Sequence, residues 1–122
     1  MTKCVLIAEK HPSWRSSYRE ELERAFPDIT IDELTSNLGD DLVEKVLNNE
    51  YKVVITNNRM TDYEGIEAIT RIRNAGNNVP IYLITADSHR KETVMNGGAT
   101  GYYNKSNFMI RDLVTELHQY LK

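Results

Sequence analysis

The chain has 122 residues, of which 40% are hydrophobic and 27% are charged, as in an ordinary globular domain with a core of its own. The 15 basic and 18 acidic side chains give a net charge of −3 without a basic cluster, so direct binding to nucleic acid is not expected. A single cysteine excludes a disulfide framework, and the lack of a long apolar run excludes a membrane span. Because the sequence also has no signal-peptide core, we expect a cytoplasmic protein with one domain over residues 1–122.

Short apolar runs alternate with segments of helical periodicity in the first half of the chain. Val5–Ala8 is continuously apolar, as expected for a parallel strand covered on both faces. The helix that Pro12 opens carries apolar residues at four-residue spacing: Trp14, Tyr18, Leu22 and Phe26. After Pro27, Ile29 and Ile31 alternate with polar residues and predict a more exposed strand. A second helix follows Gly39 and Asp40, with one apolar face: Leu42, Val43, Val46 and Leu47.

The second half of the chain repeats this alternation. The predicted strands are Lys52–Thr56, Ile81–Thr85 and Gly101–Asn104. The predicted helices are Gly65–Asn74, a weak one from about Ser88 to Asn96, and one from about Phe108 to Leu121. Five strands alternating with five helices predict an α/β fold, in which a five-stranded parallel sheet has helices on both faces. Periodicity does not give the order of the strands.

Polar residues follow four of these strands where each one ends. They are Glu9 and Lys10 after the first, Asn57 after the third, Thr85 with Ala86 at the fourth, and Lys105 after the fifth. Gly65, eight positions after Asn57, opens a helix. Because ligands bind at the carboxyl ends of the strands in such sheets, these positions predict the functional edge.

In order and spacing, these motifs resemble the receiver domain of two-component response regulators, the CheY-like superfamily. That family has two adjacent acids at the positions of Glu9 and Lys10, and a phosphoacceptor aspartate at that of Asn57. Thr85 and Lys105 match its residues that contact the phosphoryl group, and Tyr102 matches its aromatic switch residue. The resemblance implies a doubly wound, flavodoxin-like sheet of order 2-1-3-4-5.

Two short stretches resemble one branch of that family in particular. His11-Pro12 and the segment Gly98–Tyr102 are similar to the NarL/FixJ-type receivers, which usually carry a helix-turn-helix output domain. An output domain outside this chain is therefore an expectation from the resemblance.

Two departures from the family pattern change the expected chemistry. Asn57 has an amide where an acyl phosphate needs a carboxylate nucleophile. Lys10 replaces an acid, so a pocket that usually has a charge of about −2 would have about +1, from Glu9 against Lys10 and Lys105. Magnesium binding is therefore expected to be lost, with no metal and no other cofactor. The Lys10 side chain either occupies the metal position, bonded to Glu9 and Asn57, or points to solvent.

The remaining site residues leave several roles open. Thr85 and Lys105 keep a fixed polar network, coordinate a free anion, or persist without a role. Tyr102 either alternates between buried and exposed rotamers or packs, half-buried, on the final helix. Asp62 is predicted to initiate the helix before Gly65.

These features favour a pseudo-receiver, a phosphorylation-independent interaction module that is not an enzyme, because the strand-end residues supply no paired base and nucleophile. The resemblance implies a face for a protein partner or a second copy, made by the fourth helix, fifth strand and fifth helix. Candidate polar contacts on it are Arg90, Lys91, Arg111 and Asp112. The alternatives are a receiver with a non-standard acceptor and a module that binds a small anion or ligand.

Overall fold

Five parallel strands form one sheet in the order β2-β1-β3-β4-β5 in the computed structural model, which describes residues 3–87 and 89–122. This confirms the order that the family resemblance implies. The strands are β1 (Lys3–Ala8), β2 (Ile29–Leu34), β3 (Val53–Thr56), β4 (Ile81–Thr85) and β5 (Gly101–Asn104). In the centre of the sheet, Val5 is in register with Val53 and Ala8 with Thr56, so β1 and β3 end side by side.

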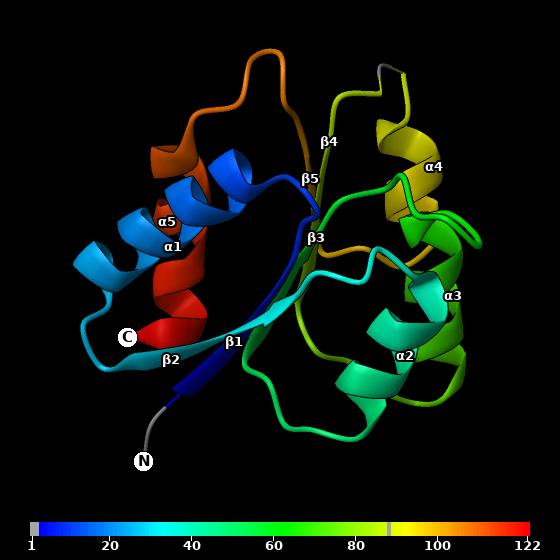
Figure 1. Ribbon diagram of the computed structural model, residues 1–122, viewed down its shortest axis with the longest axis horizontal. Coiled ribbons are helices and arrows are strands. Elements are labelled where there is room, and N and C mark those ends of the chain that lie inside the picture. Colours follow the sequence, from blue (N-terminus) through cyan, green and yellow to red (C-terminus); the bar gives the residue numbers. More distant parts are fainter. Residues whose placement is uncertain (1–2, 88) are drawn as a thin grey trace.

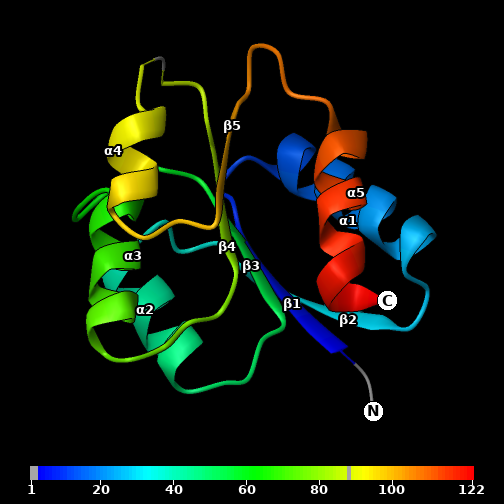
Figure 2. The same cartoon turned by 180° about the vertical axis from the view of Figure 1, so that it is seen from behind.

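The helices cover both faces of the sheet. They are α1 (Pro12–Ala25), α2 (Gly39–Leu47), α3 (Gly65–Asn74), α4 (Lys91–Asn96) and α5 (Ile110–Leu121). Figure 1 shows α1 and α5 on one face and α2, α3 and α4 on the other, and Figure 2 shows the same layers from behind. This doubly wound arrangement confirms the predicted α/β fold.

Two helices are shorter than their periodicity predicts. The final helix begins at Ile110 rather than near Phe108, because the Phe108 ring joins an aromatic cluster with Trp14, Tyr18 and Tyr103. The fourth helix begins at Lys91, and the predicted start at Ser88 lies outside the described residues.

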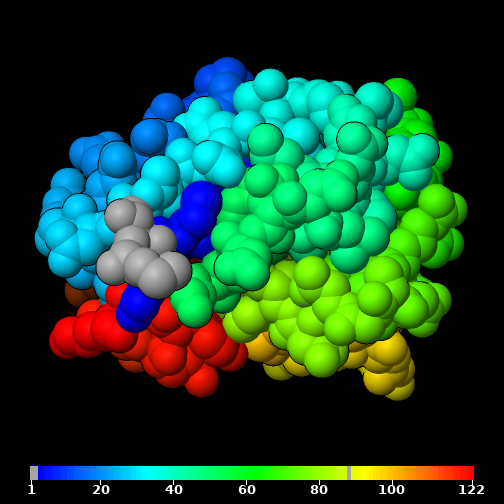
Figure 3. Space-filling view, turned by 90° about the horizontal axis from the view of Figure 1, so that it is seen from below, coloured from blue at the N-terminus to red at the C-terminus, as the bar shows by residue number. Residues whose placement is uncertain are grey.

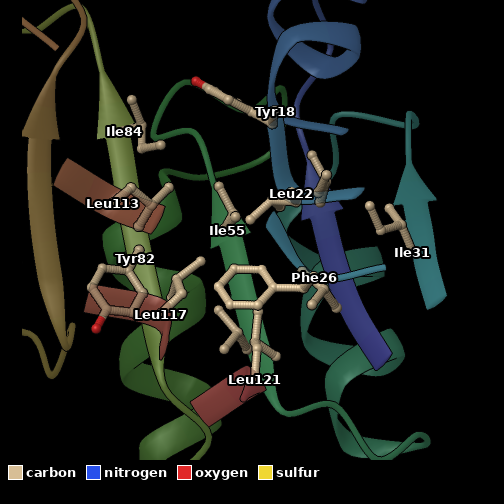
Figure 4. Packing of buried hydrophobic residues seen from close by; sticks show 13 residues of the cluster. Tyr18, Leu22, Phe26, Ile31, Ile55, Tyr82, Ile84, Leu113, Leu117 and Leu121 are labelled. Atoms are coloured by element: carbon tan, nitrogen blue, oxygen red, sulfur yellow. The ribbon is translucent and has the colours of Figure 1, made fainter. Parts of the chain in front are cut away.

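Alternate residues of the strands point to opposite faces and form two cores. Val5 and Ile7 of β1 belong to the core under α1 and α5, whereas Leu6 and Ala8 belong to the core under the other three helices. Figure 4 shows the first core, in which side chains of α1, of the residue after it and of α5 meet those of β3 and β4: Tyr18, Leu22, Phe26, Leu113, Leu117, Leu121, Ile55, Tyr82 and Ile84. Because both faces of the central strands are buried, the polar side chains that can reach solvent or a ligand lie at the ends of the strands.

The start of β1 and the end of α5 meet at the amino-terminal edge of the sheet, away from these strand ends. Figure 3 shows the last residues of α5, in red, next to the start of β1, in dark blue. The Nζ of Lys3 donates a hydrogen bond to the Lys122 carbonyl at 2.7 Å. Within residues 3–87 and 89–122, the helices are too short or too polar to traverse a bilayer.

Candidate functional site

The carboxyl edge of the sheet brings the predicted site residues together. An open hollow of about 360 Å³ lies there, and its lining includes Lys10, His11, Asn57, Asn58, Arg59, Thr85, Ala86 and Lys105. These residues lie at or directly after the ends of β1, β3, β4 and β5. The parallel sheet thus assembles residues that lie far apart in the sequence.

Glu9 and Lys105 form an ion pair at the base of this edge. The Lys105 Nζ lies 2.7 Å from Oε1 of Glu9. The Lys105 side chain is 12% exposed and that of Glu9 is 1% exposed. The other carboxylate oxygen of Glu9, Oε2, accepts a hydrogen bond from the His11 N–H at 3.1 Å. The Lys105 ammonium also lies 4.9 Å from the centre of the Trp14 ring, a cation–π contact. Both oxygens of Glu9 are therefore engaged by donors of the chain.

Lys10 is exposed, and the ammonium that meets Glu9 belongs to Lys105 instead. The hypothesis that Lys10 occupies the metal position, bonded to Glu9 and Asn57, is therefore wrong, and the solvent-facing alternative describes the structure. The physical reason lies in the loop backbone. Arg15 donates through Nη1 to the Glu9 and Lys10 carbonyls, at 2.8 and 3.3 Å, and so fixes the loop in which Lys10 stands.

Asn57 is 6% exposed and directly follows β3. Its N–H donates to the Ala8 carbonyl at 3.1 Å, which continues the pairing of β3 with β1. Its side-chain Nδ2 lies 3.4 Å from the Arg59 carbonyl, to which it donates. A Cβ on Gly65 would lie 2.4 Å from the Asn57 carbonyl oxygen, so only glycine allows α3 to begin this close to the strand end.

Thr85 lies in a polar network at the end of β4. It is 3% exposed, and its Oγ1 accepts a hydrogen bond from the Asp87 N–H at 3.2 Å. Its carbonyl accepts a hydrogen bond from the Lys105 N–H at 2.8 Å, which joins β4 to the segment after β5. These contacts agree with the network role among those considered for Thr85 and Lys105.

Asp87 is a site residue that the sequence motifs did not indicate. Its Oδ1 accepts hydrogen bonds from Nε and Nη2 of Arg59, at 2.9 and 2.6 Å. The hydrogen bonds from the Arg59 guanidinium lower the pKa of this carboxyl. Partial burial raises the pKa, but less, and the hydrogen bond from Asn58 lowers it further. The available signal was an acid two positions after Thr85, on the same edge of the sheet.

Tyr102 points into the sheet edge rather than toward the final helix. Its hydroxyl donates to the Asp87 carbonyl at 2.8 Å, and its ring is half-buried against the core that α2, α3 and α4 cover. Of the two alternatives for Tyr102, half-buried packing on the final helix is therefore wrong in its partner, although the ring is half-buried. Successive residues of β5 face opposite sides of the sheet, and Tyr103 packs on the core of α1 and α5.

Asp62 caps a different helix from the one predicted. Its carboxylate accepts hydrogen bonds from the N–H groups of Gly39 and Asp40, at 2.6 and 3.0 Å, at the start of α2. It also accepts one from the Tyr63 N–H at 2.9 Å. The loop after β3 thus supplies the cap that the residue before α2, Leu38, does not provide by its side chain.

The residues at this edge do not fit a magnesium ion. In the parts of the chain that the structure describes, His, Cys, Asp and Glu form no cluster of three or more that would hold a metal. Both oxygens of Glu9 already accept hydrogen bonds, and an ammonium lies 2.7 Å from one of them. Asn57 has an amide where a metal site would have a carboxylate, and its Nδ2 donates to the Arg59 carbonyl. Magnesium prefers oxygen ligands in octahedral geometry, which this donor set does not supply.

The family model of the response regulator receiver domain matches residues 5–118, nearly the whole chain. The chain belongs to this family. This confirms the resemblance that the strand-end motifs carry, and makes the chain a receiver domain of the two-component system.

Solved receiver structures have the same fold as this receiver domain. The wild-type Thermotoga maritima response regulator TrrA, in complex with Mg²⁺ and BeF, is 26% identical; the match covers 98% of this chain and all of that one, with a TM-score of 0.82. The Francisella response regulator 1452 receiver domain is 19% identical over 98% and 97% of the two chains, with a TM-score of 0.83. A LuxR-family DNA-binding response regulator from Staphylococcus aureus is 20% identical over 98% and 99%, with a TM-score of 0.81. None of the curated proteins matches the sequence significantly.

Proposed function

We propose that this receiver domain is a pseudo-receiver, a cytoplasmic protein-interaction module that works without phosphorylation and catalyses no reaction. The observation that carries the proposal is the amide of Asn57 at the end of β3, whose Nδ2 donates to the Arg59 carbonyl. An amide oxygen has no full negative charge and cannot form a stable acyl phosphate.

The surroundings of Asn57 support the same reading. Phosphoryl transfer depends on cations that neutralise the developing charge, and usually on magnesium. Glu9 is paired with Lys105 and is not free to hold a metal. The hydroxyl of the preceding residue, Thr56 Oγ1, donates to the Asn57 carbonyl at 3.0 Å within the buried strand, so it is poorly placed as a substitute acceptor.

The surface proposed for a partner is the face of α4, β5 and α5. Met95 of α4 is 38% exposed, Lys91 of the same helix is exposed, and so are Arg111 and Asp112 of α5, so the two helices offer both apolar and polar contacts. Arg90, the residue before α4 and another candidate contact, is already paired, because its Nη2 lies 2.8 Å from Oε1 of Glu64 in the loop before α3. The partner is a protein or a second copy of this domain, and an output domain outside these residues is part of the proposal.

Intact mass spectrometry after incubation with acetyl phosphate and magnesium tests the proposal. The wild-type domain is expected to gain no phosphoryl group. A matched positive control is the double variant Lys10→Asp and Asn57→Asp, which restores the two missing carboxylates and is expected to gain one. A stable single adduct on the wild-type domain would contradict the proposal, and peptide mapping would then locate a non-standard acceptor.

The lining of the hollow favours one alternative, a site for a free anion. Lys10, Arg59 and Lys105 contribute cations to it, while no carboxylate is among its lining residues. Titration calorimetry with inorganic phosphate separates the two functions. Saturable binding that Lys105→Met abolishes would support the anion site, whereas the pseudo-receiver is expected to release no heat of binding.

A further inference from the structure

The side chain of Asp87 joins the β4–α4 loop to the loop that follows β3. Arg59 donates two hydrogen bonds to Oδ1, and Nδ2 of Asn58 lies 3.4 Å from Oδ2. The Asp87 side chain is only 16% exposed, so this carboxylate is a sheltered anion. Its charge is compensated by a cation from the loop that contains Asn57.

The backbone of Asp87 bonds to two of the site residues, Thr85 and Tyr102. Its N–H donates to Thr85 Oγ1 at 3.2 Å, and its carbonyl accepts the Tyr102 hydroxyl at 2.8 Å. The same carbonyl accepts a hydrogen bond from Nδ2 of Asn104 at 3.2 Å, so β5 is attached at two points. One residue therefore connects the β3–α3 loop, the end of β4 and β5.

We propose that Asp87 is a resident anchor, which holds the end of β4 and Tyr102 in one arrangement without any phosphoryl group. The inference rests on the proposed function, because a partner surface that no phosphorylation sets needs another source of order. The Asp87 carboxylate supplies a permanent anion for the donors of Asn58 and Arg59. The Asp87 carbonyl, held in place in this way, then fixes the position of the Tyr102 hydroxyl, beside α4.

The strength of the anchor comes from convergence rather than from its ion pair alone. Arg59 is 76% exposed, and an ion pair with such a partner contributes little by itself. Six hydrogen bonds from five residues meet at Asp87, however, and a connected network loses more than one bond when its centre is removed.

A second link joins the same two loops next to the anchor. Nδ2 of Asn58 donates to Oε2 of Glu64 at 2.9 Å, and Oε1 of Glu64 accepts from Nη2 of Arg90, the residue before α4. This link does not include Asp87. Removal of the Asp87 carboxylate is therefore expected to loosen residue 87 and Tyr102 without unfolding the domain.

Fluorine NMR of the domain labelled with 3-fluorotyrosine tests the anchor, together with hydrogen exchange of the amide of residue 87. The chain has seven tyrosines, and Tyr102→Phe identifies the Tyr102 signal by its absence. In Asp87→Asn, the Tyr102 signal is expected to move or broaden, and the amide of residue 87 to exchange about ten-fold faster. In Arg59→Gln, which keeps the carboxylate, exchange is expected to rise about three-fold. The control is Glu92→Gln, which removes an exposed carboxylate of α4 and should change neither signal.

An unchanged Tyr102 signal and unchanged exchange in a folded Asp87→Asn variant would overturn the inference. If that variant does not fold, Arg59→Gln decides, and exchange equal to that of the wild type would overturn it. These readouts need no phosphodonor and no partner. A phosphoryl adduct on the wild-type domain would instead contradict the proposed function and leave the contacts of Asp87 as they are.

Discussion

Glu9 and Lys105 are 96 residues apart in the chain, yet Nζ of Lys105 lies 2.7 Å from Oε1 of Glu9 at the carboxyl edge of the sheet. The acid that a receiver would offer to a metal is thus occupied by the lysine that would contact a phosphoryl group. Because Asn57 is neutral, Glu9 is the anion left for this ammonium among the matched site positions. The negative charge that is missing at Asn57, after β3, is therefore replaced for Lys105 by that of Glu9, after β1.

Removing Lys105 should destabilise the domain, because it leaves the Glu9 carboxylate buried without its cation. We expect Lys105→Met to lower the free energy of unfolding by about 3 kcal/mol in urea titration. Adding Glu9→Gln should recover most of that loss. The control is Arg24→Met, which breaks exposed ion pairs with Glu20 and Glu21 and should cost less than about 1 kcal/mol. Equal losses in Lys105→Met and Arg24→Met would count against a structural ion pair.

Magnesium should leave the fluorescence of Trp14 unchanged in the wild-type domain. The indole lies 4.9 Å from the Lys105 ammonium, so a metal ion that displaced this ammonium from Glu9 would alter its emission. The double variant Lys10→Asp and Asn57→Asp offers the missing carboxylates and should show a saturable change. A saturable change in the wild-type domain would contradict the lack of fit.

Replacing Gly65 should disturb the loop after β3. A Cβ at this position would lie 2.4 Å from the Asn57 carbonyl oxygen, and the backbone of Asn57 cannot move away easily because its N–H donates to the Ala8 carbonyl of β1. We expect Gly65→Ala to lower the free energy of unfolding by roughly 1–3 kcal/mol. Gly97→Ala is the milder comparison, because its nearest obstacle is the end of the Ile66 side chain at 3.0 Å. The reverse order of the two losses would argue against the close approach.

Asp62 should make stability depend on pH in the acid range. Desolvation raises the pKa of Asp62, but hydrogen bonds from the N–H groups of Asp40, Gly39 and Tyr63 outweigh it, so the pKa lies below 3.8. A depressed pKa in the folded state gives stability that is present above the unfolded-state pKa of about 3.9 and is lost as pH falls through the folded-state value. Urea titrations between pH 5 and 2 should therefore show a smaller loss of stability in Asp62→Asn than in the wild type.

A charge on the proposed partner face should weaken association. Met95 of α4 is 38% exposed, and Leu47 of α2, at 42%, is a matched apolar side chain elsewhere on the surface. We expect Met95→Asp to reduce self-association in sedimentation analysis, or capture of a partner by immobilised domain, by about ten-fold. Leu47→Asp should change neither. Equal effects of the two substitutions would place the interface elsewhere.

The sequence by itself determined the fold class and the elements that carry the site. Buried parallel strands appear as apolar runs and amphipathic helices as four-residue repeats, because both patterns depend on local geometry. The polar residues at the strand ends, Glu9, Asn57, Thr85 and Lys105, were also predictable, since parallel strands end on one edge. The identity of Asn57 as an amide needed no structure.

Only the tertiary structure decided which of these residues meet. Lys10 and Lys105 are equivalent as charges in the sequence, and the loop that Arg15 fixes leaves Lys10 in solvent and Lys105 on Glu9. Asp62 caps α2 instead of the next helix, and Asp87 joins three segments, because hydrogen bonds between loops depend on distances that no local pattern encodes. The sheet places the strand ends at one edge, and the conformation of the loops then determines which side chains form hydrogen bonds and ion pairs there.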